Sequence, residues 1–190
     1  MNTEQTIQEI LNEIQKILAE SVGPNDRREY MQSIGVRGRD WHFGLTAEQI
    51  IENKIPPKVI GCTGVAKLFC KLAKDRGIQA FVICTARFDD WMAAKQDSTK
   101  TISNGHQINA VKIDGKLHVF DAGRRRVHFM ETSLKLGSFI DALQRGTLDY
   151  IVTAVVSGDE FSHMNTYQKL SNLYASGDMN NPEFTITPES

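Results

Sequence analysis

Apolar residues recur at helical spacing near the start of the chain. They predict an amphipathic helix that Thr3 or Thr6 caps and that ends near residues 21–25. Its apolar face is formed by Ile7, Ile10, Leu11, Ile14, Ile17 and Leu18. Because a helix with one apolar face must bury it, we expect this helix to pack against another element.

Two further helices are predicted before the middle of the chain. One covers residues 26–34 and is followed by a loop. The next begins at Thr46, because Gln49 stands three residues later and completes a capping box. It closes before the prolines of residues 54–58, which favour an extended approach to Gly61.

A fourth helix begins at or just after Cys62. Its apolar stripe consists of Val65, Leu68, Phe69, Leu72 and Ala73. Gly77 follows as a C-cap, because glycine readily adopts the left-handed conformation that ends helices. Residues 78–86 are β-branched and aromatic on both faces, which predicts a central strand.

The second half of the chain is predicted to be richer in strands. Residues 106–113 and 116–122 flank an Asp-Gly pair and form a strong hairpin signal, and residues 150–158 predict another strand. Residues 87–105 are polar and mixed, so a long loop with one helical turn is expected there. Helices are expected over 133–146 and 161–177.

This order of elements predicts an α+β fold with a mostly antiparallel sheet. Residues 1–177 are interpreted as a single domain and residues 178–190 as a loosely held tail. We find no internal repeat and no low-complexity tract.

The balance of charges excludes several classes of partner. A net charge of −1 and a pI near 6.5 give no general attraction to nucleic acid or to anionic membranes. The sequence shows neither a signal peptide nor an apolar run long enough to span a bilayer, so we expect a cytoplasmic protein, with export by a dedicated secretion system left open. The oligomeric state is also left open.

Three cysteines, Cys62, Cys70 and Cys84, form no CxxC pair, which argues against a disulfide scaffold or a zinc knuckle. We therefore expect free thiols and no cofactor. Cys84 lies within an apolar strand, and Cys70 lies on the flank of its helix among lysines that we expect to be solvated, namely Lys67, Lys71 and Lys74. Neither cysteine has a recognisable activating environment.

Cys62 has a different position, at the first turn of its helix. Unpaired backbone N–H groups and the positive end of the helix dipole lower a thiol pKa there, and the same N–H groups can hold an oxyanion. Gly61 and Gly64 leave room for a substrate backbone. The alternative is that Cys62 is a small buried apolar residue, which is the commoner role of a free cysteine.

A thiol nucleophile needs an imidazole within hydrogen-bonding reach and a group that orients it. If residues 114–115 form a tight turn, Ile108 faces Asp121, and His106 emerges on the same face as that pair. This face also carries Ala110, Leu117 and Val119. His106 and Asp121 are then diagonal neighbours that can pair, whereas His118 emerges on the other face. The alternative is two polar residues at strand ends.

The segments "GCTGVAKLFCKLAKDRGIQAFVI" and "GHQINAVKIDGKLHVFDAG" resemble the transglutaminase-like (papain-like) cysteine hydrolase superfamily, over residues 61–125. The resemblance implies a core in which a cysteine-bearing helix packs on an antiparallel sheet. It also implies that Cys62 is the nucleophile, His106 the general base and acid, and Asp121 the orienting acid. Three features depart from the family pattern: Leu117 replaces a frequent tryptophan, Gln107 stands where a small residue is common, and Asp-Ala-Gly at 121–123 replaces the frequent Asp-Pro/Ala-Thr.

The activity implied is acyl transfer from an amide of a protein or peptide substrate, to water in a protease, amidase or glutamine deamidase, or to an amine in a transglutaminase. Trp41, His42 and Gly61 are candidates for oxyanion or substrate contacts, although Trp41 also fits a core role. The arginines of residues 123–127 fit either a substrate carboxylate or a solvated hairpin end.

Two other functions are weighed against this one. The first is a protein-binding module on the same fold, with a vestigial triad and with the N-terminal helix serving a partner. The second is a metal site formed by His118, His128 and a cysteine, for which the spacing matches no recognised ligand pattern.

Overall fold

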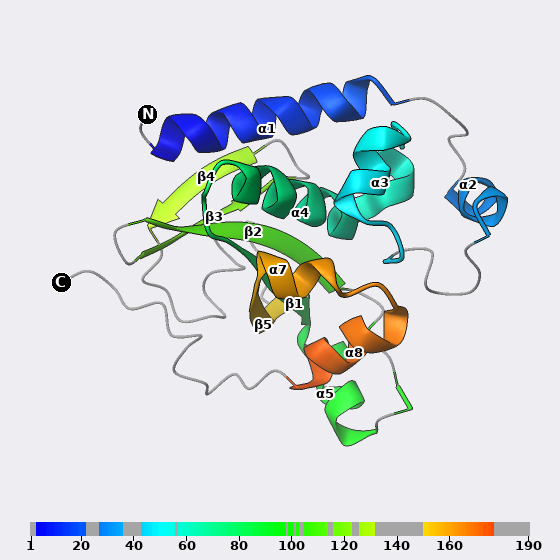
Figure 1. Ribbon diagram of the computed structural model, residues 1–190. Helices are drawn as coiled ribbons and strands as arrows, with labels where there is room; N and C mark the ends of the chain where they lie inside the picture. The colour runs from blue at the N-terminus through cyan, green and yellow to red at the C-terminus, as the bar shows by residue number, and fades with distance from the viewer. Residues whose placement is uncertain are drawn as a thin grey trace.

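Helices and an antiparallel sheet make up the protein, as the computed structural model in Figure 1 shows. The mixed α+β class predicted from the sequence is confirmed. The structure describes residues 3–21, 27–35, 43–55, 57–97, 99–100, 102, 105–113, 116–122, 126–131 and 150–176. For residues 116–121 and 126–131 the description extends to the backbone alone. The helix expected over 133–146 and the tail expected over 178–190 lie outside these ranges.

In the sequence, the helices of the described residues lie before, between and after the strands. Their bounds are α1 (Thr3–Ala19), α2 (Arg27–Ser33), α3 (Ala47–Glu52), α4 (Pro57–Asp75), α5 (Phe88–Gln96), α7 (Gly158–Ser162) and α8 (Tyr167–Ser176). Among these helices, none is long and apolar enough to cross a bilayer.

One five-stranded antiparallel sheet has the order β4-β3-β2-β1-β5. The strands are β1 (Ala80–Arg87), β2 (Gly105–Ile113), β3 (Lys116–Asp121), β4 (Arg126–Glu131) and β5 (Tyr150–Ser157). The strand predicted to be central, β1, is an interior strand of the sheet, because it pairs with β2 on one side and β5 on the other. The sequence reasoning did not predict β4.

The β2–β3 hairpin has the register that the Asp-Gly turn predicts. Ile113 lies opposite Lys116, Val111 opposite His118, and the observed pairs end one residue before the expected pair of Ile108 and Asp121. The register prediction is therefore confirmed as far as the observed pairs extend.

Packing places α4 between the sheet and α1. On one side α4 contacts β1 and β2, and on the other it is crossed by α1, as Figure 1 shows. The apolar face of α1 is buried in this layer through Ile7, Ile10, Leu11 and Ile14. Burial of that face against the chain's own helix means that α1 does not offer it to a partner.

Local capping predictions are also confirmed. Thr46 and Gln49 form the expected capping box at the start of α3, with both side chain to backbone bonds present. At the end of α4, Gly77 has φ +72°, and the N–H of Ile78 reaches back to the carbonyl of Ala73. The N–H of Gly77 also donates to the carbonyl of Lys74, and the two hydrogen bonds together form a Schellman motif.

Two secondary-structure predictions for the chain after β1 are wrong. The long loop expected over 87–105 contains the nine-residue helix α5, whose first-turn acids suit the helix dipole and whose Trp91 and Ala94 are buried three residues apart. The single helix expected over 161–177 is divided into α7 and α8. Between them the carbonyl of Met164 accepts a hydrogen bond from a lysine instead of continuing a helix.

Candidate functional site

Gly61 interrupts α4 immediately before Cys62. Its φ of 59° and ψ of −166° lie in a region that essentially only glycine adopts. Residues 57–60 form a helical turn, so the extended approach expected from the prolines is wrong; a proline is tolerated in the first turn, where its missing N–H is not needed. A new helical segment then begins at Cys62, as predicted.

Gly64 has a packing role. A Cβ at this position would overlap the Cβ of Ile60 and lie 3.2 Å from Cδ1 of Ile50. The space that the glycine leaves is therefore filled by α3 and by the preceding helical turn. The expectation that Gly64 leaves room for a substrate is wrong for this reason.

The Cys62 sulfur lies among polar groups of α4 and β2. Its thiol donates to Oε1 of Gln107 at 2.9 Å, and the hydroxyl of Thr63 donates to the same oxygen at 2.9 Å. The imidazole of His106 makes a hydrogen bond with the sulfur, and the backbone N–H groups of Gln107 and Thr63 also point at it. Cys62 is half-buried, whereas Thr63 and Gln107 are buried.

These neighbours set the pKa of the Cys62 thiol. Burial is the largest influence and raises the pKa, but it is outweighed by the His106 hydrogen bond, the positive charge of the imidazolium and the two backbone N–H groups. The net effect lowers the pKa of Cys62 below its ordinary value. A thiolate is the reactive form of cysteine, so the site makes the nucleophilic state more accessible than it is in a free cysteine.

The other two thiols have the opposite environment. Burial raises the pKa of Cys70 to about 12, and burial together with the negative charge of ionised Cys62 raises the pKa of Cys84. Cys70 is buried against Asn109 and Gly158, so its expected position on an exposed flank is wrong. All three cysteines are free thiols.

The face of β2 that contacts α4 differs from expectation. Gln107 bonds to Cys62 and Thr63, and Asn109 donates to the carbonyl of Ala66 at 3.3 Å, so alternation assigns Ile108 and Ala110 to the opposite face. The expectation that the Ile108 face carries the whole site is therefore wrong. His106 nevertheless reaches the Cys62 sulfur, so consecutive residues of β2 approach the same atom.

The side chains of three other predicted site residues are outside what the structure describes. Trp41 and His42 are outside the described ranges altogether. Asp121 is described by its backbone, which lies opposite Arg126 of β4, and its side chain is outside the description. The arginines of residues 123–125 are likewise outside it.

Lys67 is the most deeply buried cation of the described side chains, at 3% exposure, so the expectation that it is solvated is wrong. Its ammonium donates to the backbone carbonyls of Phe43 at 2.8 Å, Leu45 at 3.1 Å and Met164 at 3.1 Å. Burial lowers the pKa of Lys67 to about 8. Three carbonyl acceptors use all three N–H donors, so the ammonium serves as a structural tether.

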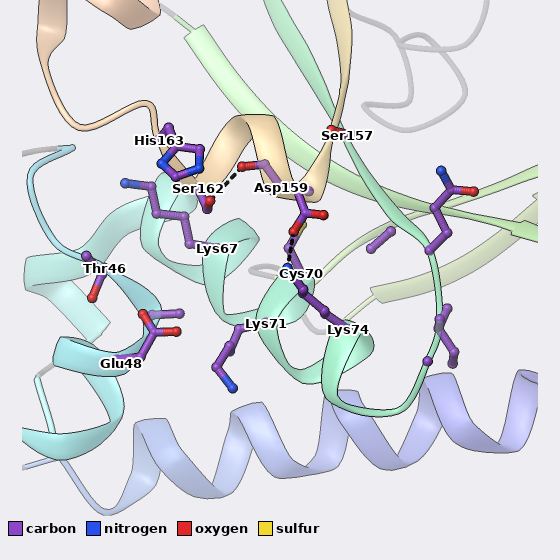
Figure 2. Close-up of a pocket in the computed structure, with 16 residues that line it drawn as sticks. Thr46, Glu48, Lys67, Cys70, Lys71, Lys74, Ser157, Asp159, Ser162 and His163 are labelled. Carbon is purple, nitrogen blue, oxygen red and sulfur yellow. Dashed lines mark hydrogen bonds and ion pairs between the residues drawn. The ribbon is translucent and has the colours of Figure 1, made fainter.

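A cavity of about 520 Å³ lies along the C-terminal half of α4 and beside α7 (Figure 2), and Cys62 does not line it. Its lining includes Lys67, Lys71 and Lys74, but each of these cations has a partner. Lys71 is paired with Asp75, and Lys74 with Asp159 at 2.6 Å, as the figure shows for the second pair. The cavity therefore presents no unpaired lysine to a ligand.

Sequence reasoning missed Gln107, Thr63 and Lys67 as members of these networks. One signal was present: Gln107 and Asn109 alternate with Ile108 and Ala110 in a strand whose apolar residues are buried on both faces. Buried amides require partners, so this alternation marks the face on which a polar network must lie.

Compared with models of protein families, with curated proteins and with solved structures, the chain has no match. The resemblance to transglutaminase-like hydrolases stays a prediction from motifs. Among the described side chains, no group of three or more His, Cys, Asp or Glu residues could hold a metal ion. The side chains of His118 and His128 are not among the described ones.

Proposed function

We propose that the protein is a cysteine-dependent acyl-transfer enzyme that acts on amide bonds of proteins or peptides. The observation that carries this proposal is the contact between the Cys62 sulfur and the His106 imidazole at the start of a helix. A binding module has no need of a thiol with a lowered pKa beside an imidazole. A papain-like or transglutaminase-like core and a cytoplasmic location are parts of the same proposal.

The reaction begins with transfer of the thiol proton to His106. The Cys62 thiolate then attacks the amide carbonyl, and a tetrahedral oxyanion forms that the Cys62 backbone N–H stabilises. His106 returns the proton to the leaving amine, which departs and leaves a thioester on Cys62. Water or a second amine, deprotonated by His106, resolves the thioester and regenerates the thiol.

Asp121 is proposed to orient His106, and Trp41 or His42 to supply a further oxyanion contact. The proposal for Asp121 is supported by the hairpin register, which leads β3 back along β2 toward His106. An aspartate in this role fixes the imidazole tautomer and stabilises the imidazolium.

The experiment that tests this function is a mass-spectrometric comparison of a peptide and protein library treated with wild-type protein or with Cys62→Ala. Cleavage, deamidation and cross-linking give different mass changes, so the acceptor is identified together with the activity. Cys62→Ala and His106→Ala are expected to lower turnover by roughly three orders of magnitude or more.

Matched controls are available within the chain. Cys70→Ala removes a buried thiol, and His163→Ala removes an exposed imidazole at the end of α7. Both variants are expected to retain turnover. Full activity in Cys62→Ala would rule out the proposed function.

A further inference from the structure

Gln107 contacts the proposed nucleophile in two ways. Its backbone N–H points at the Cys62 sulfur, and its side-chain Oε1 accepts the thiol proton at 2.9 Å. These contacts favour opposite states, because an N–H donor stabilises a thiolate whereas a carbonyl acceptor stabilises a protonated thiol. The side chain is only 5% exposed, so water does not readily replace either contact.

The orientation of the amide matters once the thiol loses its proton. A carbonyl oxygen 2.9 Å from a thiolate would be repelled, since both atoms are then acceptors. Rotation by about 180° around the last side-chain bond exchanges Oε1 with Nε2, and the amide then presents an N–H to the sulfur. The hydrogen bond from the thiol to Oε1 is lost, and a hydrogen bond from Nε2–H to the thiolate forms. The proton that left the thiol resides on His106.

Thr63 fits both orientations. Its hydroxyl donates to Oε1 of Gln107 in the observed arrangement at 2.9 Å. A hydroxyl also accepts, so after rotation it can receive the second N–H of the same amide. Thr63 therefore does not oppose rotation of the Gln107 amide.

We propose that Gln107 is a further functional residue of this site, which accepts from the Cys62 thiol at rest and donates to the Cys62 thiolate after its amide rotates. The inference rests on the proposed nucleophilic role of Cys62. Gln107 is also the residue that departs from the family pattern directly after His106. The inference gives this departure a role, because the amide can bond to the sulfur both as a thiol and as a thiolate.

Gln107→Glu tests the inference, because a carboxylate accepts from the thiol but cannot donate to a thiolate. We expect the iodoacetamide reaction of Cys62 at pH 7 to slow by about tenfold or more, with its pH midpoint moved upward. Gln49→Glu is the matched control: it adds the same charge at an exposed position and keeps the acceptor of the capping box. Gln49→Glu is expected to leave the pH midpoint of Cys62 alkylation unchanged. Its circular dichroism spectrum is also expected to match that of the wild type.

A second measurement is made on the wild-type protein and does not depend on the folding of Gln107→Glu. In ¹⁵N-labelled wild-type protein, the side-chain amide resonances of Gln107 are expected to titrate with the same midpoint as Cys62 alkylation. The Cys62→Ser protein is expected to show no such titration. A Gln107 amide that does not respond to pH, or a folded Gln107→Glu protein with unchanged alkylation, would overturn the inference.

The two proposals fail in distinguishable ways, since neither readout requires a substrate. A raised midpoint in Gln107→Glu without turnover of any library substrate would support the role of Gln107 and count against the enzymatic function. Turnover that depends on Cys62 but is unaltered in rate and pH profile by Gln107→Glu would uphold the function and remove Gln107 from it.

Discussion

The ammonium nitrogen of Lys67 lies 2.8 Å from the carbonyl oxygen of Phe43 and 3.1 Å from that of Met164. One buried side chain thereby joins α4 to the segment before α3 and to the segment after α7. An uncompensated buried charge is costly, so the lysine is tolerated because these carbonyls, with that of Leu45, surround it.

Lys67→Met is expected to lower the free energy of unfolding by about 3 kcal/mol, because three buried carbonyls lose their donor. Urea unfolding followed by circular dichroism measures the change. Lys71→Met is the matched control, since Lys71 pairs with Asp75 in a partly exposed helical pair, and it is expected to cost less than about 1 kcal/mol. Equal losses in the two variants would contradict the tether.

The pH dependence of stability provides a second prediction for Lys67. Its pKa in the folded protein is about 8, below its ordinary value of 10.5, so between these pH values the unfolded chain binds more protons at this residue. Stability conferred by this group therefore rises with pH through that window and is lost as pH falls through 8. The difference in unfolding free energy between wild type and Lys67→Met is expected to grow from pH 8 to pH 10.

Alkylation at pH 7 is expected to select Cys62. Its pKa is lowered and it is half-buried, whereas burial raises the pKa of Cys70 to about 12 and Cys84 is fully buried. Peptide mapping after brief iodoacetamide treatment is expected to show at least about tenfold more label on Cys62 than on either other cysteine.

His106→Ala is expected to raise the pKa of Cys62, because the hydrogen bond and the positive charge of the imidazolium are both removed. The pH midpoint of alkylation is therefore expected to move upward. His163 is an exposed histidine at the end of α7, so His163→Ala is expected to leave the midpoint in place. An unchanged midpoint in His106→Ala would show that the two side chains do not interact in solution.

Gly61→Ala is expected to destabilise the protein by about 1–3 kcal/mol, because φ of 59° with ψ of −166° is strained for any residue with a Cβ. Relaxation of that strain shifts the first turn at Cys62, so slower alkylation of Cys62 is expected as well. Gly35→Ala is the control: it also has a positive φ, but no atom lies within 4 Å of its added Cβ, and Cys62 alkylation should be unaffected. Thermal unfolding and alkylation rates measure the two effects.

Locally encoded features of this fold were predictable from the sequence. The capping box of Thr46 and Gln49, the left-handed Gly77 and the register around the Asp-Gly turn each depend on residues that are neighbours in the chain. The proximity of His106 to Cys62 was only partly anticipated, because the hairpin register assigned His106 to the Ile108 face, whereas α4 lies on the Gln107 face.

Features that depend on packing between distant segments were not predictable in the same way. Ile108 and Ala110 are buried, as is Val111, so strand composition does not reveal which face of β2 receives α4. Lys67 looks like a surface lysine on a helix, and only the carbonyls of two distant loops make its burial tolerable. β4 begins in an arginine run and owes its strand conformation to pairing with β3.

The order of the strands along the chain has a consequence for biosynthesis. Cys62, Thr63, His106 and Gln107 are all synthesised before β5, the edge strand that completes the other side of β1. A domain generally folds as a unit, so we expect the sulfur and its neighbours to reach their final packing only once β5, which belongs to the same sheet, has also been translated. Met164 follows β5 in the chain and provides the last-synthesised of the three carbonyls that accept from Lys67, so this tether cannot be complete before residue 164 has been translated.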